Sequence, residues 1–203
     1  EILLGGRTEE YSDFGSPATW NLSARRDMGA GIGLFGRVAT GYAPPTAADL
    51  YGGVSVHYVE PEESCSWEVG VSAEEGEDWR AYLTFFQSKF RNLIEWSDPD
   101  GDFVWTPFNM GGAYSRGIEA GISRRVAGGW NLRAGYAYLE ARDKADDSRL
   151  LRRPRHTGSF GFERAGESIL WVAEVRFAAD LMDYDQAIIA EAPGEDYAVV
   201  RLY

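Results

Sequence analysis

The sequence predicts an all-β chain, with antiparallel strands that run alternately up and down. The first observation is the alternation of apolar and polar residues, as in 67–73, where Trp67, Val69, Val71 and Ala73 form one row. Successive strand side chains point to opposite faces, so such a stretch has one apolar and one polar face. The second observation is that tight Gly-rich turns alternate with longer acidic or Pro-containing connections. The third is that no stretch keeps the helical period of about 3.6 residues.

The turn signals divide the chain into about ten strands. We expect strands at about 1–12, 18–28, 31–43, 64–75, 79–97, 103–126, 129–143, 150–165, 167–184 and 196–203. Several exceed the average strand of about 5–6 residues in soluble proteins. The longest connection, 44–62, contains Pro44, Pro45 and Pro61, and we expect an irregular loop with one helical turn near 46–50.

The unequal turns predict a segment of an up-and-down transmembrane β-barrel, in which short turns face the periplasm and long loops face outward. The outward loops would be 13–17, 44–63, 98–102, 144–149 and 185–195. The apolar rows, with Trp67, Trp79, Trp130 and Trp171, would face lipid. The polar rows would face the lumen. The pattern alone leaves open a soluble sandwich or barrel with one buried and one wet face.

Composition excludes several classes of function. The formal net charge of −12 argues against a nucleic-acid surface, which should be basic. The single cysteine, Cys65, leaves no internal disulfide and no cysteine-based zinc site. No apolar run approaches the roughly 20 residues of a membrane helix, whereas a barrel strand needs only about 9–11 residues, alternately polar.

Several short motifs resemble, in order, segments of TonB-dependent outer-membrane receptors. The motifs are GYAPPTAADLYG at 41–52, PEESCSWEVG at 61–70, NLI at 92–94, FN at 108–109, RGIEA at 116–120, YAYLEAR at 136–142 and LLRRPRH at 150–156. The last two resemble a late hairpin of the cobalamin and siderophore receptor branch. One departure is the run 54–60, where the family more often has a Gly-Asn-Pro-Asn-Leu-like run.

The resemblance implies a fold, a function and a cellular location. Receptors of this family have a plug domain inside a barrel of about 22 strands, so residues 1–203 would be a partial barrel domain without plug or closing strands. The implied function is TonB-energised import of a scarce ligand, cobalamin or a ferric siderophore, across the outer membrane of a Gram-negative bacterium. Implied partners are outer-membrane lipid, lipopolysaccharide and, through the plug, the TonB complex. No nucleic acid and no cofactor are expected.

Ligand contacts in such a receptor would lie on the outward loops. We expect them at Tyr51, His57 and Tyr58 in the long loop and at Trp105. The alternatives are a passive porin-like channel and a soluble β-rich module that binds carbohydrate through its aromatic residues.

Three motifs suggest sharper chemistry, but none predicts a catalytic, nucleotide or metal site. Residues 31–36 match G-x-G-x-x-G, but a strand and not a helix follows. The acidic run 98–102 lacks the glutamate of an EF-hand, since Pro107 stands at that position. His57 and His156 have no metal-binding partner at helical spacing. No nucleophile and base are paired, so no enzyme is predicted.

One concentrated basic patch follows the acidic stretch 143–147. Its members are Arg149, Arg152, Arg153 and Arg155. They would meet lipopolysaccharide phosphate or an anionic ligand, or, as we favour, balance Asp143, Asp146 and Asp147 across the same hairpin.

Overall fold

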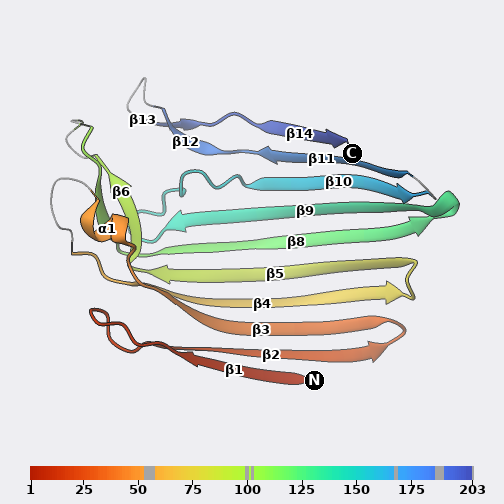
Figure 1. Cartoon of the computed structure of the whole chain (residues 1–203), viewed down its shortest axis with the longest axis horizontal. Helices are drawn as coiled ribbons and strands as arrows, with labels where there is room; N and C mark the ends of the chain where they lie inside the picture. The colour runs from red at the N-terminus through yellow and green to blue at the C-terminus, as the bar shows by residue number, and fades with distance from the viewer. Residues whose placement is uncertain (53–57, 99–100, 102, 167–168, 186–189, 203) are drawn as a thin grey trace.

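The protein is one broad antiparallel sheet with two small hairpins at one end (Figure 1). The computed structural model describes residues 1–52, 58–98, 101, 103–166, 169–185 and 190–202. The ten strands of the sheet are, in order, β1 (Ile2–Thr8), β2 (Ala18–Gly29), β3 (Ile32–Ala43), β4 (Glu62–Glu75), β5 (Trp79–Arg91), β8 (Ala113–Val126), β9 (Trp130–Asp143), β10 (His156–Ala165), β11 (Leu170–Ala179) and β14 (Tyr197–Leu202). The predicted all-β, up-and-down antiparallel fold is confirmed.

The turns are segregated by length as the sequence predicts. The tight turns after β2, β4 and β8 lie at one end of the sheet in Figure 1, which we call the turn end. The turn after β2 contains Gly29, Ala30 and Gly31, all at positive φ (83°, 52° and 74°). A 3₁₀ turn at Ala127–Gly129 joins β8 to β9. The long connections lie at the opposite end, the loop end.

Three of the predicted strands, 79–97, 103–126 and 167–184, are broken, which the alternation pattern does not indicate. The expected strand 79–97 ends at Arg91, because Asn92 adopts φ 53°, and continues as β6 (Leu93–Ser97). In the described part of the chain β6 pairs with β7 alone (Thr106–Met110), and Gly112, at φ 152°, separates β7 from β8. A positive φ turns the chain out of the extended direction. The result is a separate hairpin, β6–β7, between two paired strands, β5 and β8.

The same kind of break occurs in the expected strand 167–184. β11 ends at Ala179, and Asp180 adopts φ 55°. The chain then forms β12 (Met182–Asp185), which pairs with β13 (Ala190–Pro193) instead of with the main sheet. The predicted helical turn is confirmed as α1 (Ala47–Tyr51).

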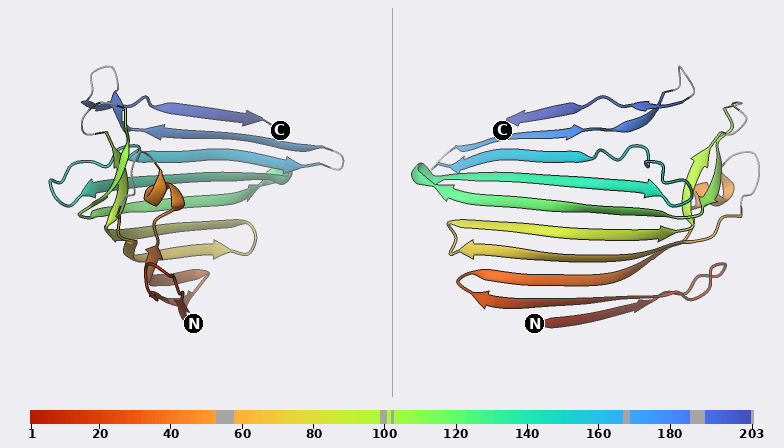
Figure 2. Two further views of the ribbon diagram at one scale, coloured as in Figure 1. Left: turned by 60° about the vertical axis from the view of Figure 1, so that its left-hand side comes forward. Right: turned by 180° about the vertical axis from the view of Figure 1, so that it is seen from behind.

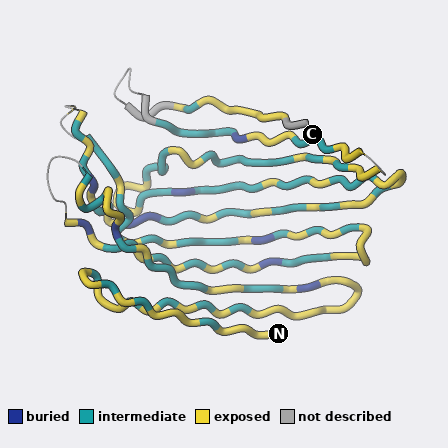
Figure 3. Tube along the Cα trace, in the orientation of Figure 1, coloured by how far each residue is buried: buried dark blue, intermediate teal, exposed yellow. Residues whose placement is uncertain are grey.

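The sheet is a single layer with almost no core (Figure 3). Ten residues whose burial is described are buried, and most of them are small: Gly33, Pro45, Val59, Gly70, Thr84, Pro107, Gly112, Ala113, Ala141 and Ala178. The ladder of backbone hydrogen bonds therefore carries the architecture. The adjoining strands agree in register over long stretches, for example from Glu63 opposite Arg91 to Glu75 opposite Trp79.

One face of the sheet carries a broad apolar band across the middle of its strands. The register places Val69 beside Phe85, Phe85 beside Ile118, and Ile118 beside Tyr138. Val69, Phe85 and many neighbours on this face are exposed. Soluble monomers rarely expose apolar patches of more than a few hundred Å². The apolar face therefore needs an apolar environment, which disfavours the soluble carbohydrate-binding alternative.

Tryptophans mark the edges of this apolar face. Trp79 and Trp130 begin the strands that follow tight turns, and Trp171 is the second residue of β11. Trp67 lies opposite Gln87, eight positions along β5 from Trp79, or about 26 Å along the strand. At a strand tilt of about 40° this separation becomes about 20 Å, close to the apolar band of about 25 Å in outer-membrane barrels. The positions of these tryptophans agree with the predicted aromatic girdle.

Candidate functional site

The loop end carries a helix that is capped by its own sequence. Thr46 is the N-cap of α1, and its hydroxyl accepts the Asp49 backbone N–H at 3.3 Å. The Asp49 carboxylate in return accepts the Thr46 N–H at 2.8 Å. This reciprocal capping box satisfies backbone donors that a helix start leaves free. The Gly52 N–H donates to the Ala48 carbonyl at 2.7 Å where the helix ends.

The helix is bound to the β6–β7 hairpin through the same carboxylate. The indole Nε1–H of Trp96 in β6 donates to Asp49 Oδ1 at 3.0 Å. Gly52 also lies against Trp96, since a Cβ at position 52 would be 3.0 Å from the indole ring. Segments 47 residues apart in sequence are thus joined, and Figure 1 shows α1 and β6 side by side.

Asn109 of β7 makes a second junction. Its Oδ1 accepts the Glu60 N–H at 2.6 Å, and its Nδ2 donates to the carbonyls of Glu60 and Asn92 at 2.9 and 2.7 Å. Asn92 Nδ2 donates to Glu60 Oε2 at 2.8 Å. One side chain therefore fastens the end of the long loop, the corner after β5 and the hairpin. We call the described residues 44–52, 58–61 and 93–98, 101 and 103–110 the loop cluster.

The loop cluster is anchored on the polar side of the sheet. Glu62 belongs to the row of β4 that contains Ser64, Ser66 and Glu68, opposite to the Trp67 row. Its Oε1 accepts the Ile94 N–H of β6 at 2.7 Å. The turned views in Figure 2 show β6 and α1 standing away from the plane of the strands. The cluster therefore borders the polar face at the loop end.

Exposed aromatic side chains gather on the loop cluster. Tyr51, the last residue of α1, is 68% exposed, Tyr58 is 97% exposed and Trp105, just before β7, is 46% exposed. Phe103, which the sequence analysis did not single out, is 88% exposed. The structure thus places three of the predicted contact residues on one connected cluster. The fourth, His57, lies outside the described residues.

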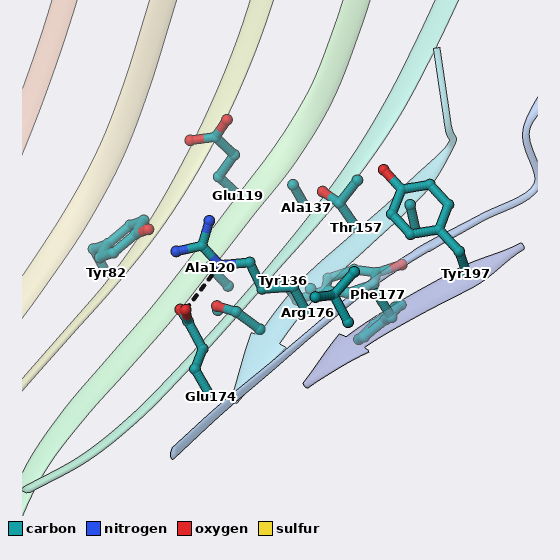
Figure 4. Close-up of a pocket in the computed structure, with 15 residues that line it drawn as sticks. Tyr82, Glu119, Ala120, Tyr136, Ala137, Thr157, Glu174, Arg176, Phe177 and Tyr197 are labelled. Atoms are coloured by element: carbon teal, nitrogen blue, oxygen red, sulfur yellow. Dashed lines mark ion pairs between the residues drawn. The ribbon is translucent and has the colours of Figure 1, made fainter. Parts of the chain in front are cut away.

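Two shallow hollows lie over the polar rows further along the sheet. Tyr82, Glu119, Glu174, Arg176 and Tyr197 line the first (Figure 4), where Arg176 Nε donates to Glu174 Oε2 at 3.0 Å. The second hollow is lined by Arg37, Thr40, Ser64, Ser66, Glu68, Thr84, Ser88 and Glu119, among others. Glu119 borders both hollows. These hydroxyl, carboxylate and guanidinium groups suit hydrogen bonding to a polar surface.

No three or more His, Cys, Asp or Glu side chains among the described residues are grouped so that they would hold a metal ion. No helix formed by these residues has the length and apolar character needed to cross a membrane.

The basic patch pairs with different acids from those predicted. Arg149 Nη1 and Arg155 Nη1 reach the two oxygens of Asp180 at 2.9 and 3.2 Å, and Arg152 Nε reaches Asp183 at 2.9 Å. The carboxylates between β9 and β10 are nearer in sequence, but the break at Asp180 brings this residue back to the arginines. The patch therefore ties the β9–β10 connection to the corner between β11 and β12.

We expect this tie to open in acid. The hydrogen bond from Arg149, supported by Arg155, holds the pKa of Asp180 below its usual range. The ionised Asp180 carboxylate therefore contributes its full share of the free energy of unfolding above the ordinary aspartate pKa of about 3.9. This contribution is lost as pH falls through the lower pKa that Asp180 has in the folded state. Hydrogen exchange, corrected for intrinsic rates, should show the Arg152 and Arg155 amides losing protection below about pH 4.

The control for this measurement is Asp180→Asn, which keeps the shape and removes the charge. The Arg152 and Arg155 amides, bonded to the Met182 and Asp180 carbonyls, should then be weakly protected already at neutral pH and show no further acid transition. An unchanged acid transition in this variant would assign the opening to another group.

The comparison with known families agrees with this geometry. Long up-and-down antiparallel strands with one exposed apolar face and one polar face are typical of a transmembrane β-barrel wall. The sequence model described as "TonB dependent receptor-like, beta-barrel" matches residues 1–203. The chain belongs to the TonB-dependent receptor family and supplies part of its β-barrel.

Individual relatives give the same result. The chain is 30% identical over 189 residues to the vitamin B12 transporter BtuB of Photobacterium profundum, covering 89% of this chain and 30% of the relative. The BtuB of Vibrio vulnificus is 31% identical over 192 residues, 87% of this chain and 29% of that protein. The chain thus spans about 30% of the length of these relatives.

Solved structures share the fold at lower identity. A variant of the ferric enterobactin receptor PfeA of Pseudomonas aeruginosa superposes with a TM-score of 0.78 at 18% identity, over 99% of this chain and 34% of that one. The ferric-catecholate import receptor Fiu of E. coli K12 has a TM-score of 0.69 at 20% identity, over 92% and 28%. The fold is therefore that of a receptor barrel section.

Proposed function

We propose that this chain forms part of the wall and ligand-binding rim of an outer-membrane active transporter for cobalamin or a ferric siderophore, energised by TonB. The loop end faces outward and the turn end faces the periplasm. TonB would act through parts of the receptor other than this wall section. Membership of the receptor family and the relatives named for vitamin B12 and enterobactin support this function.

The loop cluster carries the proposal, because it combines rigidity with exposed aromatic surface. Asp49 and Asn109 hold α1 and the hairpin together, so that Tyr51, Tyr58 and Trp105 are presented from a connected base. Flat, rigid aromatic side chains bury large area at a small entropy cost. Cobalamin and ferric catecholates both offer broad rings to such contacts. His57 belongs to the same proposed contact set.

The test measures binding of cyanocobalamin and ferric enterobactin to cells that express the protein from its native gene. Tyr51→Ala, Tyr58→Ala and Trp105→Ala should each weaken binding of the true ligand, by about tenfold where a ring is buried in the complex. Tyr11→Ala is the matched control, because Tyr11 lies in another loop-end connection, where its ring contacts that of Tyr42 in a tilted arrangement.

Energised transport is tested separately from binding. A protonophore should abolish uptake and leave surface binding unchanged, because TonB draws on the inner-membrane gradient. Uptake that continues at the same rate, and that does not saturate with ligand concentration, would instead support the porin-like alternative. Full binding in all three aromatic variants would exclude the loop cluster as the contact site.

A further inference from the structure

A group of cations lies on the apolar side of the sheet, at the loop end. The register aligns Lys89, Tyr114 and Arg142 in one row across β5, β8 and β9. The adjoining row towards the turn end contains Gln87, Arg116 and Glu140. On β8 this face carries Tyr114, Arg116 and Ile118, which are two residues apart. The cationic side chains therefore lie on the same face as the apolar row.

A half-buried carboxylate organises the two arginines. Glu140, whose side chain is 16% exposed, accepts Arg116 Nε through Oε2 at 2.8 Å and Arg142 Nε through Oε1, also at 2.8 Å. Arg142 also binds Asp147 at 3.0 Å, and the Tyr114 hydroxyl donates to the same Asp147 carboxylate at 2.9 Å. The Arg116 guanidinium lies 5.6 Å from the centre of the Tyr114 ring.

Donors of this group remain available. The Arg116 side chain is 57% exposed, and within the described residues it bonds Glu140 through Nε and Nη2 alone, so the other N–H groups of its guanidinium are available to a ligand. Lys89 is exposed, and within the described residues its ammonium has no ion pair. The next pair outward, Arg91 with Glu63 at 3.9 Å, is neutral. Three cationic side chains face two carboxylates, Glu140 and Asp147, so the group has a net charge of +1.

The place of this group in the membrane identifies its ligand. Charged side chains are expensive in the hydrocarbon and lie at headgroup level. A guanidinium and an ammonium on one surface match phosphate oxygens. We propose that Lys89, Arg116 and Arg142 bind the phosphate groups of a phosphorylated glycolipid in the outer leaflet, with Glu140 as the positioning residue. The proposal rests on the outward orientation of the loop end given above.

The experiment compares lipid binding by the detergent-purified protein, measured by native mass spectrometry. The probes are lipid A, dephosphorylated lipid A and inorganic phosphate. Lys89→Gln combined with Arg116→Gln should reduce lipid A retention by about tenfold for each cation removed. The matched control is Arg124→Gln: Arg124 lies on the same row of β8, eight residues towards the turn end, and is also exposed. It should retain lipid A like the wild type.

Each outcome decides the proposal. Preference for lipid A over both other probes, lost in the double variant and kept in Arg124→Gln, supports it. Equal retention of dephosphorylated lipid A, equal loss in Arg124→Gln, or displacement by inorganic phosphate at the lipid concentration would overturn it. Lys89→Gln alone disturbs no ion pair of the described residues, so it serves if the double variant fails to fold. Because no transported ligand is present, the result is independent of uptake.

Discussion

Gly31→Ala is expected to destabilise the sheet by about 2–5 kcal/mol. Gly31 has φ 74°, and an alanine in this region costs about 1–2 kcal/mol. A Cβ there would also overlap the backbone carbonyl oxygen of Glu74, the residue whose N–H donates to the Gly31 carbonyl at 2.9 Å. Backbone cannot swing aside like a side chain, so relieving the overlap should cost a further 1–3 kcal/mol, roughly.

Gly29→Ala in the same turn separates the two contributions. Gly29 has φ 83°, but a Cβ there would meet nothing within 4 Å. Ala30, at φ 52°, shows that this turn already accepts one alanine at positive φ. Urea unfolding of the protein in detergent micelles should therefore rank wild type above Gly29→Ala and Gly29→Ala well above Gly31→Ala. Equal midpoints for the two variants would show that the close approach to Glu74 carries no cost.

Strand positions and faces could be predicted because the alternation of apolar and polar side chains along a strand is a local property of the sequence. The alternation from Trp67 to Ala73 shows by itself which side chains share a face. The pairing of β4 with β3 and β5 preserves that assignment. The segregation of tight and long turns follows from the same alternation. No long-range information is needed for either.

The breaks at Asn92, Gly112 and Asp180 could not be predicted in this way. The residues of β6 have the composition of a strand and do form one, but with β7 as the partner. The choice of partner depends on contacts such as Glu62 with Ile94, which are distant in sequence. The acids that pair with the basic patch, Asp180 and Asp183, could not be predicted for the same reason, because they are distant from the arginines in sequence.

The sequence predicts several residues of the candidate site but not the contacts that hold them together. Tyr51, Tyr58 and Trp105 stand in loops, where exposed aromatics suggest binding. The helical turn near 46–50 was predicted, but its capping by Thr46 and Asp49 was not. Nothing local indicates that Asp49 also binds Trp96, or that Asn109 closes the cluster.

Asn109→Ala is expected to weaken ligand binding by tenfold or more while the sheet stays intact. The substitution removes three hydrogen bonds that join Glu60, Asn92 and β7. Each contributes about 1 kcal/mol net, and the two carbonyls and one N–H left behind must find water. The pairing of β5 with β8 does not involve Asn109, so urea unfolding should change little. The loss should appear in ligand affinity and in faster hydrogen exchange at the Glu60 amide.

Asn131→Ala is the matched control, because Asn131 also bonds through its amide on the polar face but lies in β9, away from the loop cluster. Its Nδ2 donates to Glu163 at 3.2 Å, and its Oδ1 accepts from Ser123 at 3.2 Å. This variant should keep ligand affinity and the slow exchange at Glu60. If Asn109→Ala exchanged slowly at Glu60 and bound ligand normally, the loop cluster would not depend on this junction. If exchange accelerated without loss of affinity, the junction would exist but the ligand would bind elsewhere, because contacts presented from a loosened base must pay more ordering entropy.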